Sequence, residues 1–533
     1  MQALPTSSTA TRCSTSPFGD HLGFGYVSTP PFIGVLAALV KTLFGYSQFG
    51  IKFFPALAGA GSLVLIALLV RDLGGKNLAL ILAGAGYLAA GAFLRSNSLF
   101  QPVAFNQFFW LLSAWLSLKL VLTKNTRLWL WIGAVFGLAF LNKYSIVFFA
   151  VSLTAALLLS RHRKLIFSRH FLGGMGIGFL VVLPNLIWQH QHNWPVIHHM
   201  DELYATQLVH VTTSGFLLDQ LLQCAASAPI WIFGLFAVLL VPKEGLYRYL
   251  GMTFLLVQIA LLLGSGKSYY TLGAFPMLYA AGGYAMEKYL PGRLRWVSYG
   301  ILLLVTAFSL AVLPLGLPVA SFETVKRYCD PETGIAPQRW EDGEVHPLPQ
   351  DFADMTGWKE LTALVTEGYG RLDPAGRARC TICGKLRTGR RHCLLRPCPR
   401  SARAISFHDS YLLWAPDSIP AGPFLYVNDG GRHGNLLRPS GGNRSGRKPR
   451  LPGKNGLTVW LCAGPREGWQ DFYAQKGGRI KHLPLNPPAG TALGCSSPEQ
   501  GCHNTPRMLH CSDNSGWQCR NRIVQDRRNN PSG

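Results

Sequence analysis

Charged residues are scarce in this chain. Only 14% of its 533 residues are Asp, Glu, Lys or Arg, whereas 49% are hydrophobic. Between residues 49 and 317, apolar segments follow one another, and each approaches the roughly 20 residues that a membrane-spanning helix needs. So many consecutive segments without a polar face argue against a soluble all-helical protein. The predicted spans are 49–70, 77–94, 103–122, 128–142, 145–160, 171–188, 221–241, 249–265, 271–287 and 296–317.

Acidic residues are scarcer than basic ones, with 26 against 50, and the net charge is +24. Within the apolar region, the basic residues fall mostly at every second boundary between segments. The positive-inside rule assigns those boundaries to the cytoplasm. The basic boundaries hold Arg71 and Lys76; Lys119, Lys124 and Arg127; Arg161, Arg163, Lys164 and Arg169; Lys243 and Arg248; and Lys288, Arg293 and Arg295. The outward regions are then 1–48, 95–102, the surroundings of Lys143, 189–220, the surroundings of Lys267, and everything after 318.

The N-terminal stretch lacks the apolar core of a cleavable signal peptide, because Met1 to Asp20 is polar. We therefore expect the first span to act as an internal signal. Ten spans would place both ends outside. Since a chain that begins outside is unusual, the pattern favours a further span upstream.

Composition divides the chain into four regions. An outward loop (1–48) precedes a transmembrane domain (49–317), an extracytoplasmic domain (318–484) and a tail (485–533) that is rich in Pro, Ser and Asn. Most of the excess positive charge lies after residue 370. An amphipathic helix is predicted over 351–370, and short strands over 403–416, 422–429 and 456–465, which together indicate a small outward α/β domain.

Cysteine is present at twelve positions, and some of the spacing imitates a metal site. Cys380-x2-Cys383 followed by Cys393-x4-Cys398 has the spacing of a zinc knuckle. No apolar framework surrounds these residues, so we predict no metal site there.

Five stretches resemble one family, and they occur in the family's order between the predicted spans. The chain resembles the bacterial family 39 glycosyltransferases of the GT-C superfamily, which are similar to protein O-mannosyltransferases and to aminoarabinose transferases of lipid A. The resemblance covers about 18–382, 403–428 and 456–483. The stretches read GDHLGFGYVSTPPFIGVLAALVKTLFG, LFQPVAFNQFFWLLSAWL, WIGAVFGLAFLNKYSIVFF, LPNLIWQHQHNWPVIHHMDEL and GKSYYTLGAFPMLYAAGGYAMEKYL.

The resemblance implies a polytopic α-helical membrane protein of GT-C type in the bacterial inner membrane. It also implies inverting transfer of a sugar from a polyprenyl-phosphate donor to a hydroxyl or amine, on the outer face. The acceptor would be a glycolipid, a lipopolysaccharide or a protein, a divalent metal could assist, and nucleic acid is not an expected partner. A transporter or flippase for lipid-linked sugars is a different reading, although no internal repeat supports it. An inactive lipid-binding relative is a third.

The family's expected general base is missing. The family carries an Asp-Glu pair before its Gly-Tyr-x-x-x-Pro-Pro stretch, but residues 1–17 contain no acid. One choice of codons for Thr9 to Pro17, shifted by one base, encodes Asp-Glu-Met-Leu-Tyr-Phe-Ala. A shift at Cys383–His392 likewise produces a family-like stretch. We therefore interpret 1–17, 383–402, about 430–455 and 485–533 as out of frame; ordinary but unusual loops are the alternative.

Several polar residues at outward boundaries are candidates for substrate binding. Lys267, Tyr269 and Tyr270 begin a span, where an ammonium and two phenols suit a lipid phosphate. Lys143 between two spans is a further candidate. Each lysine could instead be an interfacial anchor with its hydrocarbon stem in the membrane.

Two more residues complete the predicted site. The Gly-Tyr-x-x-x-Pro-Pro stretch contributes Tyr26. Asn106 lies where the family often has Asp; it cannot act as a base, but its amide can hydrogen-bond a sugar. The histidines of the loop 189–213 are read as a solvated helix face, because their spacing matches no known metal site.

Overall fold

The computed structural model describes residues 18–45 and 47–330 continuously, and shorter stretches between 332 and 465. Most described residues are helical. The N-terminal helices are α2 (Phe32–Phe44), α3 (Gln48–Leu73), α4 (Asn77–Ala89), α5 (Gly91–Ser96), α6 (Pro102–Thr123), α7 (Leu128–Asn142), α8 (Ile146–Leu159), η1 (Arg163–Leu165), α9 (Arg169–Gln191) and α10 (Pro195–Thr206). The following ones are η2 (Leu208–His210), α11 (Thr213–Leu222), η3 (Ala225–Ser227), α12 (Ala228–Leu240), η4 (Pro242–Glu244), α13 (Arg248–Leu263), η5 (Ser268–Ala274), α14 (Phe275–Tyr289), η6 (Gly292–Leu294), α15 (Arg295–Gly316) and α16 (Phe322–Cys329).

Helix α14 forms the centre of the bundle. Its residues are buried from Phe275 to Met286, and it packs against α12, α4 and α3. Glycines allow this close approach. A Cβ on Gly282 would lie 2.0 Å from the carbonyl oxygen of Ile230 in α12, and one on Gly283 would lie 2.4 Å from that of Ala79 in α4. Small residues are the usual means by which membrane helices bring their backbones together.

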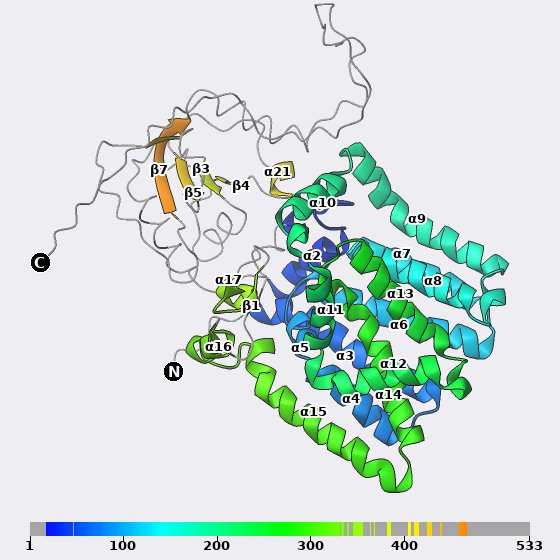
Figure 1. The fold of residues 1–533 in the computed structure, drawn as a ribbon. Coiled ribbons are helices and arrows are strands. Elements are labelled where there is room, and N and C mark those ends of the chain that lie inside the picture. Colours follow the sequence, from blue (N-terminus) through cyan, green and yellow to red (C-terminus); the bar gives the residue numbers. More distant parts are fainter. Residues whose placement is uncertain are drawn as a thin grey trace, which may run out of the picture. The chain divides into compact units, whose positions relative to one another are not determined.

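Helices α9 and α15 lie along the outer edges of the bundle (Figure 1), and only 11% of the apolar window of each is buried. Helix α9 is attached to α7 through glycines. A Cβ on Gly133 would lie 1.9 Å from the carbonyl oxygen of Gly174. The faces of both helices that point away from the bundle are apolar, as is usual for surfaces that contact lipid.

Each of the ten predicted spans contains a helix, but fewer helices than ten are long enough to cross a bilayer alone. Among the described residues, four are long and apolar enough (α3, α6, α9, and η6 with α15), and a fifth results if the pair α11 and η3–α12, bent by 63°, is one span. The predicted span 77–94 is interrupted at Ala90, whose backbone is extended. Hydropathy measures transfer into lipid and does not report where a helix breaks, so the number of spans stays a prediction.

The predicted outward loop 1–48 contains a helix that the sequence analysis did not anticipate. Helix α2 begins after Pro31 and ends at Gly45, whose φ of 58° is left-handed. With 13 residues, or about 20 Å at 1.5 Å per residue, it is too short to span a membrane.

The five boundaries with clustered basic residues meet at one end of the bundle. Asp72 after α3 accepts hydrogen bonds from Lys119 and Trp115 of α6, at 2.7 and 2.9 Å. His162 after α8 contacts the carbonyl oxygen of Leu246 at 3.0 Å. The Glu287 carboxylate accepts from the backbone N–H of Lys76, just before α4, and from that of Leu78 in its first turn. We call this the inward end, because the positive-inside rule predicts it to be cytoplasmic.

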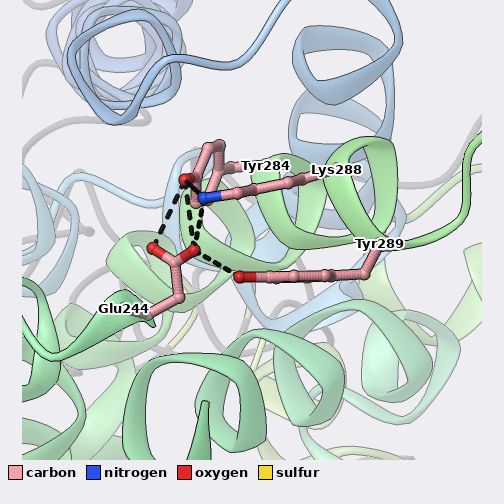
Figure 2. Close-up of polar contacts among 4 residues, drawn as sticks. All are labelled: Glu244, Tyr284, Lys288 and Tyr289. Carbon is pink, nitrogen blue, oxygen red and sulfur yellow. Dashed lines mark hydrogen bonds and ion pairs between the residues drawn. The ribbon is translucent and has the colours of Figure 1, made fainter. Parts of the chain in front are cut away.

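A buried carboxylate completes the inward end (Figure 2). Glu244 is 1% exposed and joins the turn between α12 and α13 to the end of α14. It accepts from Lys288 at 2.6 Å and from the Tyr289 hydroxyl at 2.5 Å, and Tyr284 lies at 3.3 Å. The Glu244 charge is therefore matched by one ammonium and two hydroxyls, which is what a buried carboxylate requires.

The described stretches after residue 330 contain short elements. Strands β1 (Gln338–Arg339) and β2 (Val345–His346) pair antiparallel, and α17 (Gln350–Asp354) and α21 (Tyr411–Trp414) are helical turns. A mixed sheet has the order β4-β3-β5-β7-β6. Its strands are β3 (Thr381–Gly384), β4 (Arg403–Ser406), β5 (Phe424–Asn428), β6 (Leu437–Pro439) and β7 (Thr458–Pro465).

Strands β4, β5 and β7 lie within the three stretches predicted to form strands. The prediction was wrong at Tyr411–Trp414, which is helical, because an apolar run of four residues does not distinguish a strand from a helical turn. Of the cysteine pattern, Cys383 lies in β3, and the other three cysteines lie outside the described residues. Most of the helix predicted over 351–370 and the stretches 1–17 and 485–533 also lie outside them.

Candidate functional site

Four of the predicted site residues come together at the other end of the bundle, which we call the outward end. Helix α7 ends at Asn142, and Lys143 has extended backbone at the break before α8. The Lys143 ammonium lies 4.2 Å from the centre of the Tyr270 ring and 4.9 Å from that of Tyr269. Lys267 immediately precedes η5, which carries both tyrosines. The two lysines that the sequence offered as separate candidates thus share one site.

The break that positions Lys143 is held by its neighbours. The Asn142 side chain donates to the carbonyl oxygen of Pro102, at the start of α6, at 2.9 Å. Asn142 Oδ1 and Ser145 Oγ are buried, and neither has a hydrogen-bond partner among the residues that the structure describes. The site therefore has hydrogen-bonding capacity that no described side chain uses.

The loop between α9 and α11 covers the start of η5. The Lys267 ammonium donates to the side-chain oxygen of Gln207, at the end of α10. Ser268 donates to Asp219 of α11 at 2.6 Å, and Thr271 donates to Gln220 at 2.6 Å. These contacts hold Lys267 and η5 in place.

The electrostatics of the cluster favour an anion. Burial, together with the positive charge of Lys267, lowers the pKa of Lys143 to about 7. In the described part of the chain, Lys143 contacts aromatic rings and has no ion pair. A bound phosphate would lie between like charges and would relieve their repulsion.

Asn106 belongs to the same part of the bundle. It is 3% exposed, and its Oδ1 has no partner within the described residues. Trp110, one helical turn further along α6, packs against Gly273 of η5 and stacks on Phe149 of α8. Because positions i and i+4 share a helix face, Asn106 lies on the face of α6 that meets η5.

Tyr26 lies in the loop before α2 and is 1% exposed. Its hydroxyl donates to the carbonyl oxygens of Phe18 and His21 at 2.9 and 3.1 Å, and burial raises its pKa to about 12. The Tyr26 hydroxyl therefore joins two parts of the same loop. Its role in substrate binding stays a prediction.

Helix α9 carries a buried polar pair, Asn185 and Gln189, which was not predicted from the sequence. Asn185 and Gln189 are each 1% exposed, one turn apart in an apolar helix. Asn185 donates to the carbonyl oxygen of Phe24 at 2.7 Å and accepts from the Tyr144 hydroxyl at 3.3 Å. Gln189 donates to the same hydroxyl at 2.9 Å. Two amides at i and i+4 in a membrane helix were the available signal, since such groups face the protein interior.

No group of three His, Cys, Asp or Glu suited to hold a metal ion exists within the described ranges. The divalent metal that the resemblance allows stays an expectation.

Part of the sequence matches known proteins. The family model described as dolichyl-phosphate-mannose-protein mannosyltransferase matches residues 28–188. The lipid A galacturonosyltransferase RgtD of Rhizobium johnstonii is 27% identical over 188 residues, which are 35% of this chain. The match spans 39% of that relative's length.

Two solved structures share the fold. ArnT from Cupriavidus metallidurans, bound to undecaprenyl phosphate, has a TM-score of 0.53 and 15% identity over 80% of this chain and 89% of that one. The apo form of the same protein has a TM-score of 0.52 and 12% identity over 81% and 89%. The chain therefore shares the α-helical fold of these membrane proteins, which is the fold class that the resemblance implied.

Proposed function

We propose that this chain is an inverting glycosyltransferase that moves a sugar from a polyprenyl-phosphate donor to a hydroxyl or amine of a glycolipid, at the outward end of the bundle. Placement of that end on the outer face of the bacterial inner membrane is part of the proposal. One observation carries it: Lys143 and Lys267 lie together beside two tyrosines, in a fold shared with a protein solved bound to undecaprenyl phosphate. RgtD, named as a transferase that acts on lipid A, favours a glycolipid acceptor.

The roles follow from chemistry. The two ammonium groups bind the donor phosphate, and Asn106 offers its amide to the sugar. The acceptor oxygen or nitrogen attacks the anomeric carbon, the bond from that carbon to the phosphate oxygen breaks, and polyprenyl phosphate leaves. The acceptor proton passes to a carboxylate base. The lysines stabilise the negative charge that develops on the leaving phosphate.

The proposed transfer needs a general base, and no Asp or Glu precedes Asp20 in the sequence. Asp20 is the first acid in the sequence, and it forms an ion pair with Lys41 at 2.8 Å. This observation favours a second candidate, a lipid-binding relative that does not transfer sugar. Both candidates require the same phosphate site.

Binding of undecaprenyl phosphate to the purified full-length chain tests that site. A charge-assisted hydrogen bond contributes roughly 1.5–3 kcal/mol, and about 1.4 kcal/mol is a factor of ten. We expect Lys143→Ala and Lys267→Ala each to weaken binding about ten- to a hundredfold. Lys267→Arg should retain more affinity, because it keeps the charge.

Lys243→Ala is the matched control, since Lys243 is an exposed lysine at the inward end. It should leave the affinity unchanged. Equal affinities for the control and the two site variants would move the phosphate site elsewhere and overturn the proposal.

A further inference from the structure

The loop between Phe18 and Pro31 has few backbone hydrogen bonds of its own. The Tyr26 N–H donates to the carbonyl oxygen of Thr29 at 3.1 Å, and no other hydrogen bond joins two backbone groups of residues 21–31, all of which the structure describes. Leu22 and Phe24 are 61% and 63% exposed. A loop of this kind takes one conformation only if other elements hold it.

Helix α9 holds the loop on one side. Trp188 packs so closely on Gly25 that a Cβ there would lie 2.3 Å from the indole ring. Asn185 binds the Phe24 carbonyl oxygen, and its own oxygen accepts from Tyr144, the residue next to Lys143. The loop is thereby connected to the lysine cluster, which consists of Lys143, Lys267, Tyr269 and Tyr270.

Helix α21 contacts the same loop through an aromatic side chain. The Trp414 indole stacks on His21, with ring centres 4.6 Å apart and planes inclined by 17°. The indole also makes edge-to-face contacts with Phe18 and Tyr26, with ring centres 5.9 and 6.2 Å apart. Three residues of the loop therefore share one tryptophan, nearly 400 positions away in the sequence.

A buried hydrogen bond fixes the register of this contact. The Val27 N–H donates to Ser410 Oγ at 2.9 Å. Ser410 is 0% exposed and Val27 is 6% exposed. Loss of the Ser410 hydroxyl would leave a buried backbone donor unsatisfied, which is costly.

We propose that Ser410 and Trp414 are positioning residues. They hold the loop between Phe18 and Pro31 against α9, beside the lysine cluster. This assignment rests on the proposed function for its purpose, because the loop carries Tyr26 and follows the stretch where the family has its base. Its mechanical part, that α21 orders the loop, does not depend on any activity.

Hydrogen exchange of the full-length chain in detergent tests the mechanical part. We expect peptides covering 18–29 to exchange about tenfold faster in Ser410→Ala, because one buried hydrogen bond is lost. In Trp414→Ala the effect should be larger. Ser410→Thr keeps the hydroxyl and should restore slow exchange, which a loss of local packing alone would not allow.

Trp340→Ala is the control, since Trp340 stacks on His346 and donates to the Leu348 carbonyl oxygen. Among the described residues, its ring makes no hydrogen bond or aromatic contact with the loop. Peptides from α6 and α8 report whether each variant is folded. Unchanged exchange over 18–29 in both Ser410→Ala and Trp414→Ala would overturn the proposal.

Undecaprenyl phosphate binding separates positioning from direct binding. Trp414→Ala should keep its affinity within about threefold of the unmodified chain, because Lys143 and Lys267 are intact. A loss as large as that of Lys143→Ala would show that the loop is part of the phosphate site and refute the separate role. Failure of Lys143→Ala to affect binding would refute the proposed function, but would leave the exchange result standing.

Discussion

Each end of the bundle has a lysine beside two tyrosines, but the charged residue next to that lysine is acidic at one end and basic at the other. At the inward end, Lys288 lies 4.9 and 5.5 Å from the ring centres of Tyr284 and Tyr289. At the outward end, Lys143 lies 4.9 and 4.2 Å from those of Tyr269 and Tyr270. The inward lysine is paired with the carboxylate of Glu244, whereas the outward lysine has a second lysine as its neighbour.

The difference separates a cluster whose charges are balanced within the chain from the cluster that we propose to bind the donor phosphate. An ammonium with a carboxylate and two hydroxyls has its charge and hydrogen bonds satisfied, so the inward cluster joins the α12–α13 turn to α14. Lys143 has no ion pair within the described residues, and the neighbouring charge of Lys267 disfavours its charged form, which a bound anion would favour. A lipid phosphate would supply to the outward cluster what Glu244 supplies to the inward one.

The largest effect is expected from topology, because it is all or none. Alkaline phosphatase folds only outside the cytoplasm, where its disulfides form. Fusion after Gly292, at the inward end, should give no activity, and fusion after Leu317 should be active. The reverse pattern would exchange the two ends and place the lysine pair in the cytoplasm.

Restoration of the reading frame is expected to have the next largest effect. General base catalysis contributes roughly a hundred- to ten-thousand-fold. A chain in which Thr9–Pro17 is replaced by Asp-Glu-Met-Leu-Tyr-Phe-Ala should therefore transfer sugar from a polyprenyl-phosphate donor at least about a hundredfold faster than the chain as written. The control carries Asn-Gln in place of Asp-Glu. Full activity of the unmodified chain would refute both the frame hypothesis and the assignment of the base.

Removal of the inward lysine should destabilise the protein. Lys288→Ala leaves the Glu244 carboxylate buried without its cation, at a cost of about 3 kcal/mol. We expect a clear fall in the midpoint of thermal unfolding in detergent. Lys243→Ala, an exposed neighbour at the same end, should not change it. If Lys143→Ala lowered the midpoint as much as Lys288→Ala, the contrast between the two ends would fail.

The smallest expected effect is the pH dependence of the ligand-free protein. Folding lowers the pKa of Lys143 to about 7, well below its ordinary value, so the unfolded chain binds more protons between these pH values. Stability should therefore rise with pH from 7 toward about 10. Over the same range, undecaprenyl phosphate should bind more weakly, because the free lysine loses its charge.

Lys143→Met removes this titration and is the control for it. The unfolding midpoint and the affinity of the variant should both lose the part of their pH dependence that lies above pH 7. An affinity that rises with pH in the unmodified chain would contradict the assignment of Lys143 to the phosphate.

The sequence alone was sufficient for the fold class and for the two-sidedness of the bundle. Basic residues at alternate boundaries predicted which boundaries share an end, and the contacts of Asp72, His162 and Glu244 join those boundaries. This succeeded because hydropathy and charge act on each segment separately, in the membrane, before tertiary packing.

Helix continuity and the short apolar segments were less predictable. Helix α2, the break at Ala90 and the turn Tyr411–Trp414 depend on local backbone geometry and on what each segment packs against. An apolar run has the same hydropathy in each of these conformations.

Residue types at the boundaries named Lys143 and Lys267 as candidates, but only the tertiary structure placed them in one site. They are separated by 124 positions in the sequence, and no pattern along the chain reports that distance in space. The same holds for Asn185 beside Tyr144, and for Ser410 and Trp414 against the loop 18–27. Composition sorts segments between lipid and water, whereas the pairing of side chains from distant segments is decided by how the helices pack.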